Sequence, residues 1–207
     1  MNKILLTGGS GKLGTLLQKY LDSFDAPSHE ELDVIKPIVP NDIYTMVVHC
    51  AAYTNVREAE KEHVKCIEIN YKGTRNLRNA YKFIPFVYIS SEYASVDNDT
   101  WYGLSKAMGE FATKEYEPYL ILRTYFKPKP FPYDKAFIDQ YTQGDYVDVI
   151  AELIAKEINK WDRKTSQTIY VGTGRKTVYQ LAIKTRPDVK PCSIHDIEGL
   201  ALPSDYL

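Results

Sequence analysis

Cysteine is scarce in this sequence of 207 residues, which contains only Cys50, Cys66 and Cys192. Their number is odd, they lie far apart, and no C-x-x-C pair occurs, so we expect neither a disulfide framework nor a zinc site. The 4 histidines show no metal-ligand spacing either, and no metal is predicted. Cysteine scarcity favours a reducing compartment, and in the absence of any targeting signal we expect a cytoplasmic protein.

Long apolar runs and an excess of charge of one sign are also missing. No apolar run approaches the roughly 18 residues that a membrane-spanning helix needs, so no membrane partner is predicted. The formal net charge is −1, which provides no basic surface for nucleic acid. Hydrophobic residues make up 44% of the chain, a proportion typical of globular proteins with a buried core.

Short apolar runs alternate with segments of helical periodicity along most of the chain. Strands are expected at 4–6, 46–48, 86–89, 119–122 and 168–171. Helices are expected over 13–24, about 60–82, and from 101 and 150 onward. Apolar strands separated by helices indicate an α/β fold of the Rossmann type, with a doubly wound parallel sheet. A further strand should lie within 24–34, where Pro27 and mixed polarity obscure it.

A proline-rich stretch over 127–132 can be neither helix nor central strand. We expect it to carry the chain from a Rossmann core over 1–126 into the remaining residues, 127–207. That second part should hold the last core elements and a reduced C-terminal substrate lobe. The length predicts one domain over 1–207.

A glycine-rich turn, residues 7–14, follows the first strand and opens the first helix. Its glycines allow a tight turn, a close approach of the backbone to a pyrophosphate, and close packing of the helix on the sheet. The amides at the start of the helix can donate to the phosphate. The turn predicts binding of NAD(P) by Gly8, Ser10, Gly11, Lys12, Leu13 and Gly14. A P-loop is excluded, because leucine stands at position 13 where Ser or Thr should hold magnesium. A glycine-rich turn without a ligand is the alternative.

A tyrosine and a lysine lie one helical turn apart at positions 102 and 106, so both face one side of a helix. An ammonium beside a phenol lowers the pKa of the phenol, which suits Tyr102 for proton exchange with a carbonyl or alcohol oxygen. The buried strand before this helix ends at Ser90 and Ser91, and such a serine can bind the same oxygen. The alternative is an exposed surface pair of Tyr102 and Lys106.

Together these motifs resemble the extended short-chain dehydrogenase/reductase superfamily, most closely its dTDP-4-dehydrorhamnose reductase branch. The resemblance covers residues 1–126 well and the rest in outline. Besides the glycine-rich turn and the Ser/Tyr/Lys set, the similar segments are 32–34, 48–56, 59–60, 70–74, 109–110, 122–124 and 145–149.

The resemblance implies an enzyme that transfers hydride between NAD(P) and a nucleotide-linked sugar, most sharply a reductase of a 4-keto-6-deoxy sugar. Tyr102 would be the acid/base, Lys106 would hold the nicotinamide ribose, and Ser91 would bind the reacting carbonyl. Further cofactor contacts would come from Asp33, Val34, Ala51, Ala52 and Tyr53. Glu92 and Phe126, which replace an aspartate and a tryptophan of that branch, would border the sugar.

Several alternatives stay open at this stage. The segments 93–101 and 127–145 are shorter than in the reductases, which favours a second hypothesis, a non-catalytic NAD(P)-binding regulatory or scaffold subunit. An acidic residue at the end of the second strand would select NAD(H), but that end falls anywhere from Asp25 to Glu30. Ser28 and His29 give a slight preference for NADP(H). A homodimer through helices 60–82 and 101–117 is possible by the same resemblance.

Overall fold

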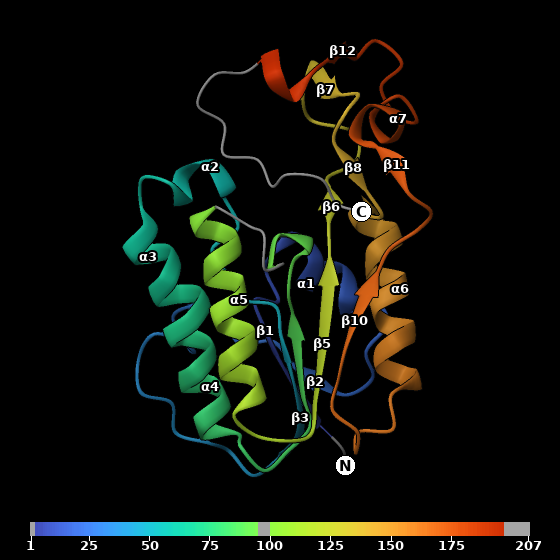
Figure 1. Ribbon diagram of the computed structural model, residues 1–207. Helices are drawn as coiled ribbons and strands as arrows, with labels where there is room; N and C mark the ends of the chain where they lie inside the picture. Colours follow the sequence, from blue (N-terminus) through green and yellow to red (C-terminus); the bar gives the residue numbers. More distant parts are fainter. Residues whose placement is uncertain (1–2, 95–99, 197–207) are drawn as a thin grey trace.

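The computed structural model describes residues 3–94 and 100–196, and a six-stranded parallel sheet lies at its centre (Figure 1). The strand order is β10 (Gln167–Val171), β5 (Tyr119–Thr124), β4 (Phe86–Ile89), β3 (Tyr44–His49), β1 (Lys3–Thr7) and β2 (Phe24–Asp25). The order reverses at β1, between β2 and β3. In sheets of this kind the ligand crevice lies at such a reversal, outside the carboxyl ends of the strands.

Helices cover both faces of the sheet, which confirms the predicted doubly wound Rossmann-type fold. One face carries α1 (Lys12–Leu17) and α6 (Val147–Lys160). The other carries α2 (Val56–Ala59), α3 (His63–Ile67), the π-helix η1 (Glu68–Gly73), α4 (Thr74–Ala80) and α5 (Trp101–Lys114).

The continuous apolar strands follow from burial on two sides. Ile4 and Leu6 of β1 point into the core beneath α1 and α6, whereas Leu5 between them points into the core beneath α4. Successive side chains of a strand alternate between the faces, so a strand buried on both faces is apolar over most of its length.

The first helix is shorter than predicted. It ends at Leu17, and Phe24 belongs to β2, where it pairs with Ile4 of β1. Ser23 adopts a positive φ of 47° and its carbonyl accepts from the Ile4 amide, so the chain turns into the sheet at that point. Phe24 packs on the same core as the apolar residues of α1, but it does so from the sheet. Its spacing therefore resembles a continuation of the helix although the helix has already ended. The expected further strand therefore exists at the start of 24–34.

A smaller group of elements lies above the carboxyl ends of the sheet (Figure 1). Its short strands are β6 (Phe126–Lys127), β7 (Lys135–Phe137), β8 (Tyr141–Thr142), β9 (Asp145–Tyr146), β11 (Lys176–Thr177) and β12 (Lys190–Cys192). They accompany α7 (Val178–Ala182) and the short 3-10 helices η2 (Glu92–Ala94) and η3 (Ile194–Asp196). Phe131, Tyr146 and Leu181 belong to a separate small core here. The division of the chain at residue 126 stays a prediction.

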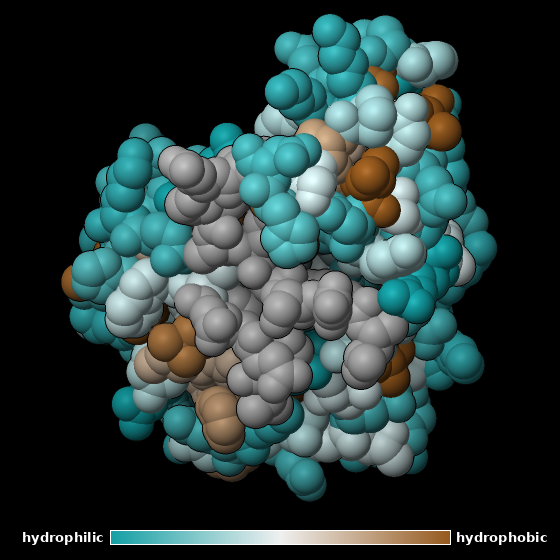
Figure 2. Space-filling model, turned by 45° about the horizontal axis from the view of Figure 1, so that its top comes forward, coloured by the Kyte–Doolittle hydropathy of each residue, from teal (hydrophilic) through white to brown (hydrophobic). Residues whose placement is uncertain are grey.

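The surface on the carboxyl-end side is mainly hydrophilic, with hydrophobic residues in small separate groups (Figure 2). Within residues 3–94 and 100–196, no helix combines the length and the apolar character that crossing a bilayer requires.

Arg78 of α4 is completely buried and joins the ends of two helices. Its guanidinium donates to the carbonyl oxygens of Tyr81 at 2.9 Å, Ile84 at 3.2 Å and Thr113 at 3.3 Å, and also to that of Tyr116. Carbonyls after the last turn of a helix have no partner within that helix. Arg78 therefore supplies donors that the ends of α4 and α5 lack.

Replacing Arg78 with methionine should destabilise the fold, because it leaves buried carbonyl oxygens without donors. We expect a loss of about 3 kcal/mol or more in the free energy of unfolding, measured by urea denaturation. Arg75→Met is the matched control, since Arg75 forms only an exposed pair with Glu115 and should change stability by about 0.5 kcal/mol or less. Equal effects of the two substitutions would contradict this account.

Candidate functional site

A cavity of about 820 Å³ opens at the carboxyl ends of β1, β3, β4 and β5. Its walls come from the glycine-rich turn, the loop after β3, the N-terminal part of α5 and the segment after β5. Among the residues predicted for a site, those lining the cavity are Gly8, Ser10, Gly11, Lys12, Leu13, Gly14, Asp33, Val34, Ala51, Ala52, Ser91, Tyr102, Lys106 and Phe126. The fold thus gathers residues that are nearly 120 positions apart in the sequence on one cavity.

Two glycines of the turn cannot carry a side chain. Gly8 has a φ of +68°, and a Cβ atom there would lie 2.6 Å from the amide nitrogen of Ala51. A Cβ atom at Gly14 would lie 2.2 Å from the carbonyl oxygen of Gly8. The turn, the first helix and the loop after β3 therefore pack backbone to backbone. Gly11 precedes the helix without a side chain to cap it, so amides of the first helical turn face the cavity without a capping partner.

A buried histidine relay holds the loop after β3 in place. Thr7 Oγ1 lies 2.7 Å from His49 Nδ1, and His49 Nε2 lies 3.0 Å from Thr74 Oγ1. Thr74 donates to the Asn70 carbonyl, and the Ala51 amide donates to Thr7 Oγ1. Because the Thr74 hydroxyl donates to Asn70, His49 Nε2 must carry the proton that Thr74 Oγ1 accepts. Burial lowers the pKa of His49 to about 3, which keeps the ring neutral.

Tyr53 and Glu92 are the two predicted site residues that do not line the cavity. The Tyr53 hydroxyl donates to Glu62, and its backbone is bound on both sides by the side-chain amide of Asn70. The sequence pattern placed Tyr53 beside two lining alanines but could not show that the chain turns outward there. Thr54, the next residue, returns to the cavity wall.

The carboxylate of Glu92 is engaged with the upper group of strands. It accepts a hydrogen bond of 2.8 Å from Thr142 Oγ1 and one of 3.3 Å from the Gln143 amide. Burial raises the pKa of Glu92, against these hydrogen bonds, which lower it. Glu92 therefore fastens the segment after Ser91 to β8. The predicted contact between Glu92 and a sugar is not supported by this structure, because Glu92 does not line the cavity.

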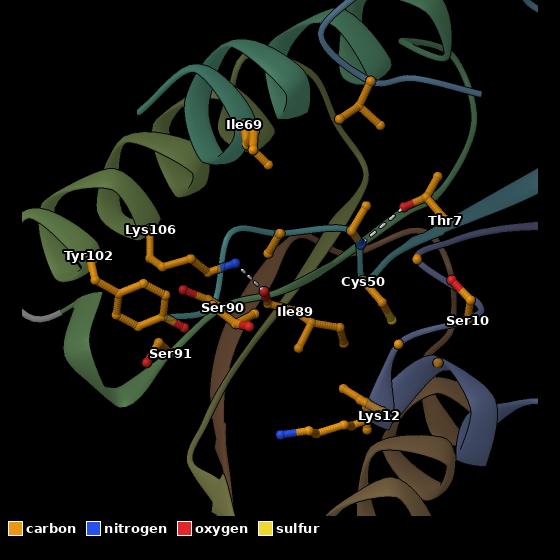
Figure 3. Close-up of a pocket in the computed structure, with 18 of the residues that line it drawn as sticks. Thr7, Ser10, Lys12, Cys50, Ile69, Ile89, Ser90, Ser91, Tyr102 and Lys106 are labelled. Carbon is orange, nitrogen blue, oxygen red and sulfur yellow. Dashed lines mark hydrogen bonds between the residues drawn. The ribbon is translucent and has the colours of Figure 1, made fainter. Parts of the chain in front are cut away.

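Tyr102 and Ser91 face each other at one end of the cavity (Figure 3). Burial raises the pKa of Tyr102 to about 12, and a hydrogen bond with Ser91 opposes that rise. Ser91 Oγ also accepts from the Tyr93 amide at 3.1 Å. Its hydroxyl proton is thus directed toward the phenol or toward an oxygen that approaches the phenol. A phenol with a pKa this high carries its proton at neutral pH.

Lys106 lies one helical turn from Tyr102, as predicted, but does not lower the pKa of that phenol. Its Nζ donates to the Ile89 carbonyl at 2.7 Å and lies 4.3 Å above the centre of the Tyr88 ring. Burial lowers the pKa of Lys106 to about 8, and the charge of Glu110 partly offsets this. The expectation of a lowered Tyr102 pKa is therefore wrong in this structure, since burial raises the pKa of the phenol.

A buried ion pair supports this end of the cavity from behind. Glu110, one turn after Lys106, accepts from Arg123 Nε and Nη2, both at 2.8 Å. It also accepts from Ser90 Oγ at 2.6 Å. The bidentate pair fixes α5 against the ends of β4 and β5.

The far end of the cavity contains the residues after β2. Asp25, the last residue of that strand, forms an ion pair with Lys3 at 2.7 Å and accepts from the Tyr44 hydroxyl. It does not line the cavity, whereas His29 and Asp33 do. The acidic residue at the strand end is therefore bound elsewhere.

Among the residues of the cavity wall that sequence reasoning did not identify as site residues are Tyr93, Tyr125, Lys127 and Tyr133. Three of them follow β5, in or near the proline-rich stretch. Proline interrupts periodicity there, so no pattern reports which side chains turn inward. The run of aromatic and basic residues between the prolines was the available signal.

Comparison with known families gives a match over residues 1–126 to the family described as the RmlD substrate binding domain. Two curated relatives carry the name dTDP-4-dehydrorhamnose reductase. One, from Mycolicibacterium smegmatis, is 28% identical over 171 residues, which cover 73% of this chain and 50% of the relative. The other, from Streptomyces griseus, is 30% identical over 138 residues, covering 55% and 45%. The chain thus spans about half the length of the curated relatives that it matches.

A solved structure extends the likeness through most of the fold. The dTDP-4-dehydrorhamnose reductase of Bacillus anthracis, determined in complex with NADP, is 25% identical and superposes with a TM-score of 0.80. The superposition covers 95% of this chain and 87% of that structure.

Proposed function

This chain belongs to the RmlD substrate binding domain family, and on that basis we propose that it is an NADP(H)-dependent reductase of a nucleotide-linked 4-keto-6-deoxy sugar. One observation carries the proposal: Ser91, Tyr102 and Lys106 line the same cavity as the glycine-rich turn. A dinucleotide lying on that turn would reach the reactive side chains with its other end. The names of both curated relatives support the sugar class.

The residues present suit a dinucleotide. Its pyrophosphate would lie on the turn, where the backbone at Gly8 and Gly14 is packed too closely for a side chain. The first amides of α1 have no side-chain cap there. Lys106 would reach the nicotinamide ribose. NADP(H) is favoured over NAD(H), because Asp25 is held by Lys3 and Tyr44 and is not at the cavity to accept from a ribose 2′-hydroxyl. The NADP in the Bacillus anthracis structure supports this preference.

The dinucleotide, when bound, supplies the hydride that reduces the sugar carbonyl carbon. Ser91 would bind the carbonyl oxygen and Tyr102 would give it a proton, so that a ketone becomes an alcohol. The pKa of about 12 keeps that proton on Tyr102 until negative charge develops on the substrate oxygen. Solvent would then reprotonate the phenolate.

Tyr102→Phe should abolish turnover while leaving the fold and dinucleotide binding intact, because only a hydroxyl is removed. We expect kcat to fall by roughly 10²- to 10⁴-fold. NADPH oxidation with a panel of nucleotide-linked keto sugars measures this, and the dissociation constant of NADPH provides the control. Full activity of the variant would contradict the role of Tyr102. Dinucleotide binding without turnover by the wild-type protein would instead favour a non-catalytic regulatory or scaffold subunit.

The pH dependence of kcat/KM should depend on the charge of Lys106. The pKa of Lys106 is lowered from 10.5 to about 8, so its positive charge is present below that pH and lost above it. We expect kcat/KM for NADPH to decline as pH rises through about 8, while Tyr102, with a pKa of about 12, stays protonated. The measurement is kcat/KM between about pH 6 and 10. A profile that remains flat to pH 10 would contradict a requirement for the Lys106 charge.

We also propose that the chain forms a homodimer through the outer face of α3 and α5. Trp101, Leu104 and Phe111 of α5 are exposed, and Phe111 is 74% exposed. Val64 of α3 is 63% exposed, and the ring of its neighbour His63 stacks on Trp101 at 4.7 Å. Exposed large apolar side chains on two neighbouring helices are typical of protein interfaces.

Phe111→Glu should convert the dimer to monomers, because it would bury a charge without a partner at each copy of the interface. Sedimentation velocity at micromolar concentration measures the change. Ile138→Glu is the control, since Ile138 is also exposed but directly follows β7, away from α3 and α5. A wild-type protein that sediments as a monomer would refute the dimer without affecting the reductase proposal.

A further inference from the structure

A lysine side chain enters the cavity from the segment after β5, away from the glycine-rich turn. Lys127 Nζ lies 5.0 Å from the centre of the Tyr125 ring and 5.1 Å from that of Tyr133. All three residues line the cavity. In the described part of the chain Lys127 has no carboxylate within ion-pair distance. Lys129, two residues later, differs, because it pairs with Asp148 at 3.0 Å outside the cavity wall.

The two rings hold this cation without neutralising it. Attraction between an ammonium and an aromatic face is worth about 0.5–1 kcal/mol at an accessible site, enough to orient the side chain. The full positive charge stays available to a ligand. A cation in a concave site without a carboxylate partner raises the local concentration of anions.

A row of aromatic rings connects Lys127 with the reactive end of the cavity. The Tyr102 and Tyr93 rings meet edge to face at 6.0 Å, and the Tyr93 and Tyr125 rings lie 6.1 Å apart. Lys127 stands over the last of these. Aromatic walls with a few polar groups are typical of sites for small organic ligands. One ligand lying along the row would have its uncharged end at Tyr102 and an anionic group at Lys127.

We propose that Lys127, held between the rings of Tyr125 and Tyr133, binds the diphosphate that links sugar and nucleoside in the substrate. The inference rests on the proposed reductase function and adds to it the residue that selects a diphosphate-linked sugar over a free one. The dinucleotide has its own phosphate site on the turn at 8–14, a different wall of the cavity. The charge at Lys127 is therefore left for the second ligand.

The test is isothermal titration of the NADP⁺-saturated protein with dTDP, comparing wild type with Lys127→Met. We expect dTDP affinity to fall by roughly 10- to 100-fold, the usual effect of removing a hydrogen bond between charged groups. Lys127→Arg retains the charge and should stay within a few-fold of wild type. Lys129→Met is the matched control and should bind dTDP as wild type does. NADPH affinity, measured separately, should be the same in all four proteins and shows that each is folded.

The inference is overturned if Lys127→Met binds dTDP as tightly as wild type. It is also overturned if the variant loses NADPH affinity but not dTDP affinity, because the cation would then serve the dinucleotide. Absence of binding by dTDP, UDP and GDP to wild type would overturn it as well. The reductase proposal is judged apart, by turnover: Lys127-dependent dTDP binding without sugar reduction would uphold the subsite and refute the reductase.

Discussion

A Cβ atom at Gly109 would lie 2.2 Å from the Tyr88 hydroxyl oxygen and 2.7 Å from the Asn70 carbonyl oxygen. The absence of a side chain there lets α5 pack directly on β4 and on the π-helix η1. Lys106, on the same buried face, then lies over the Tyr88 ring, and Tyr102 reaches Ser91 beyond the end of β4. A helix displaced outward by one methyl group would separate these partners, so the arrangement of the cavity depends on this contact.

Close packing also sets the charges of the site. Desolvation raises the pKa of the Tyr102 phenol to about 12 and lowers the pKa of the Lys106 ammonium to about 8. Glu110 on the next turn is paired with Arg123, which offsets part of the cost of burying its charge. The result is a proton donor and a cation of modest pKa side by side, a combination suited to reducing a carbonyl near neutral pH.

Sequence patterns predicted those parts of the fold that a single physical rule governs. Continuous apolar runs gave the strands, since both sheet faces are buried, and the glycine spacing gave the turn that lines the cavity. Side-chain direction was harder: Tyr53 and Glu92 sit among lining residues yet bond to Glu62 and Thr142 instead. The direction of the Tyr102 pKa shift was predicted wrongly, because spacing shows a neighbouring lysine but does not show that the phenol is buried. Lys127 was missed because proline removes periodicity.

In the proposed reaction, hydride passes from the dinucleotide to a sugar carbonyl carbon beside Tyr102. Its most direct test uses NADPH with deuterium at both C4 positions of the nicotinamide, incubated with the protein and dTDP-4-keto-6-deoxy sugar. The account predicts one deuterium in the product, bound at sugar carbon 4, by mass spectrometry and NMR. Product without deuterium, or deuterium at another sugar carbon, would contradict it.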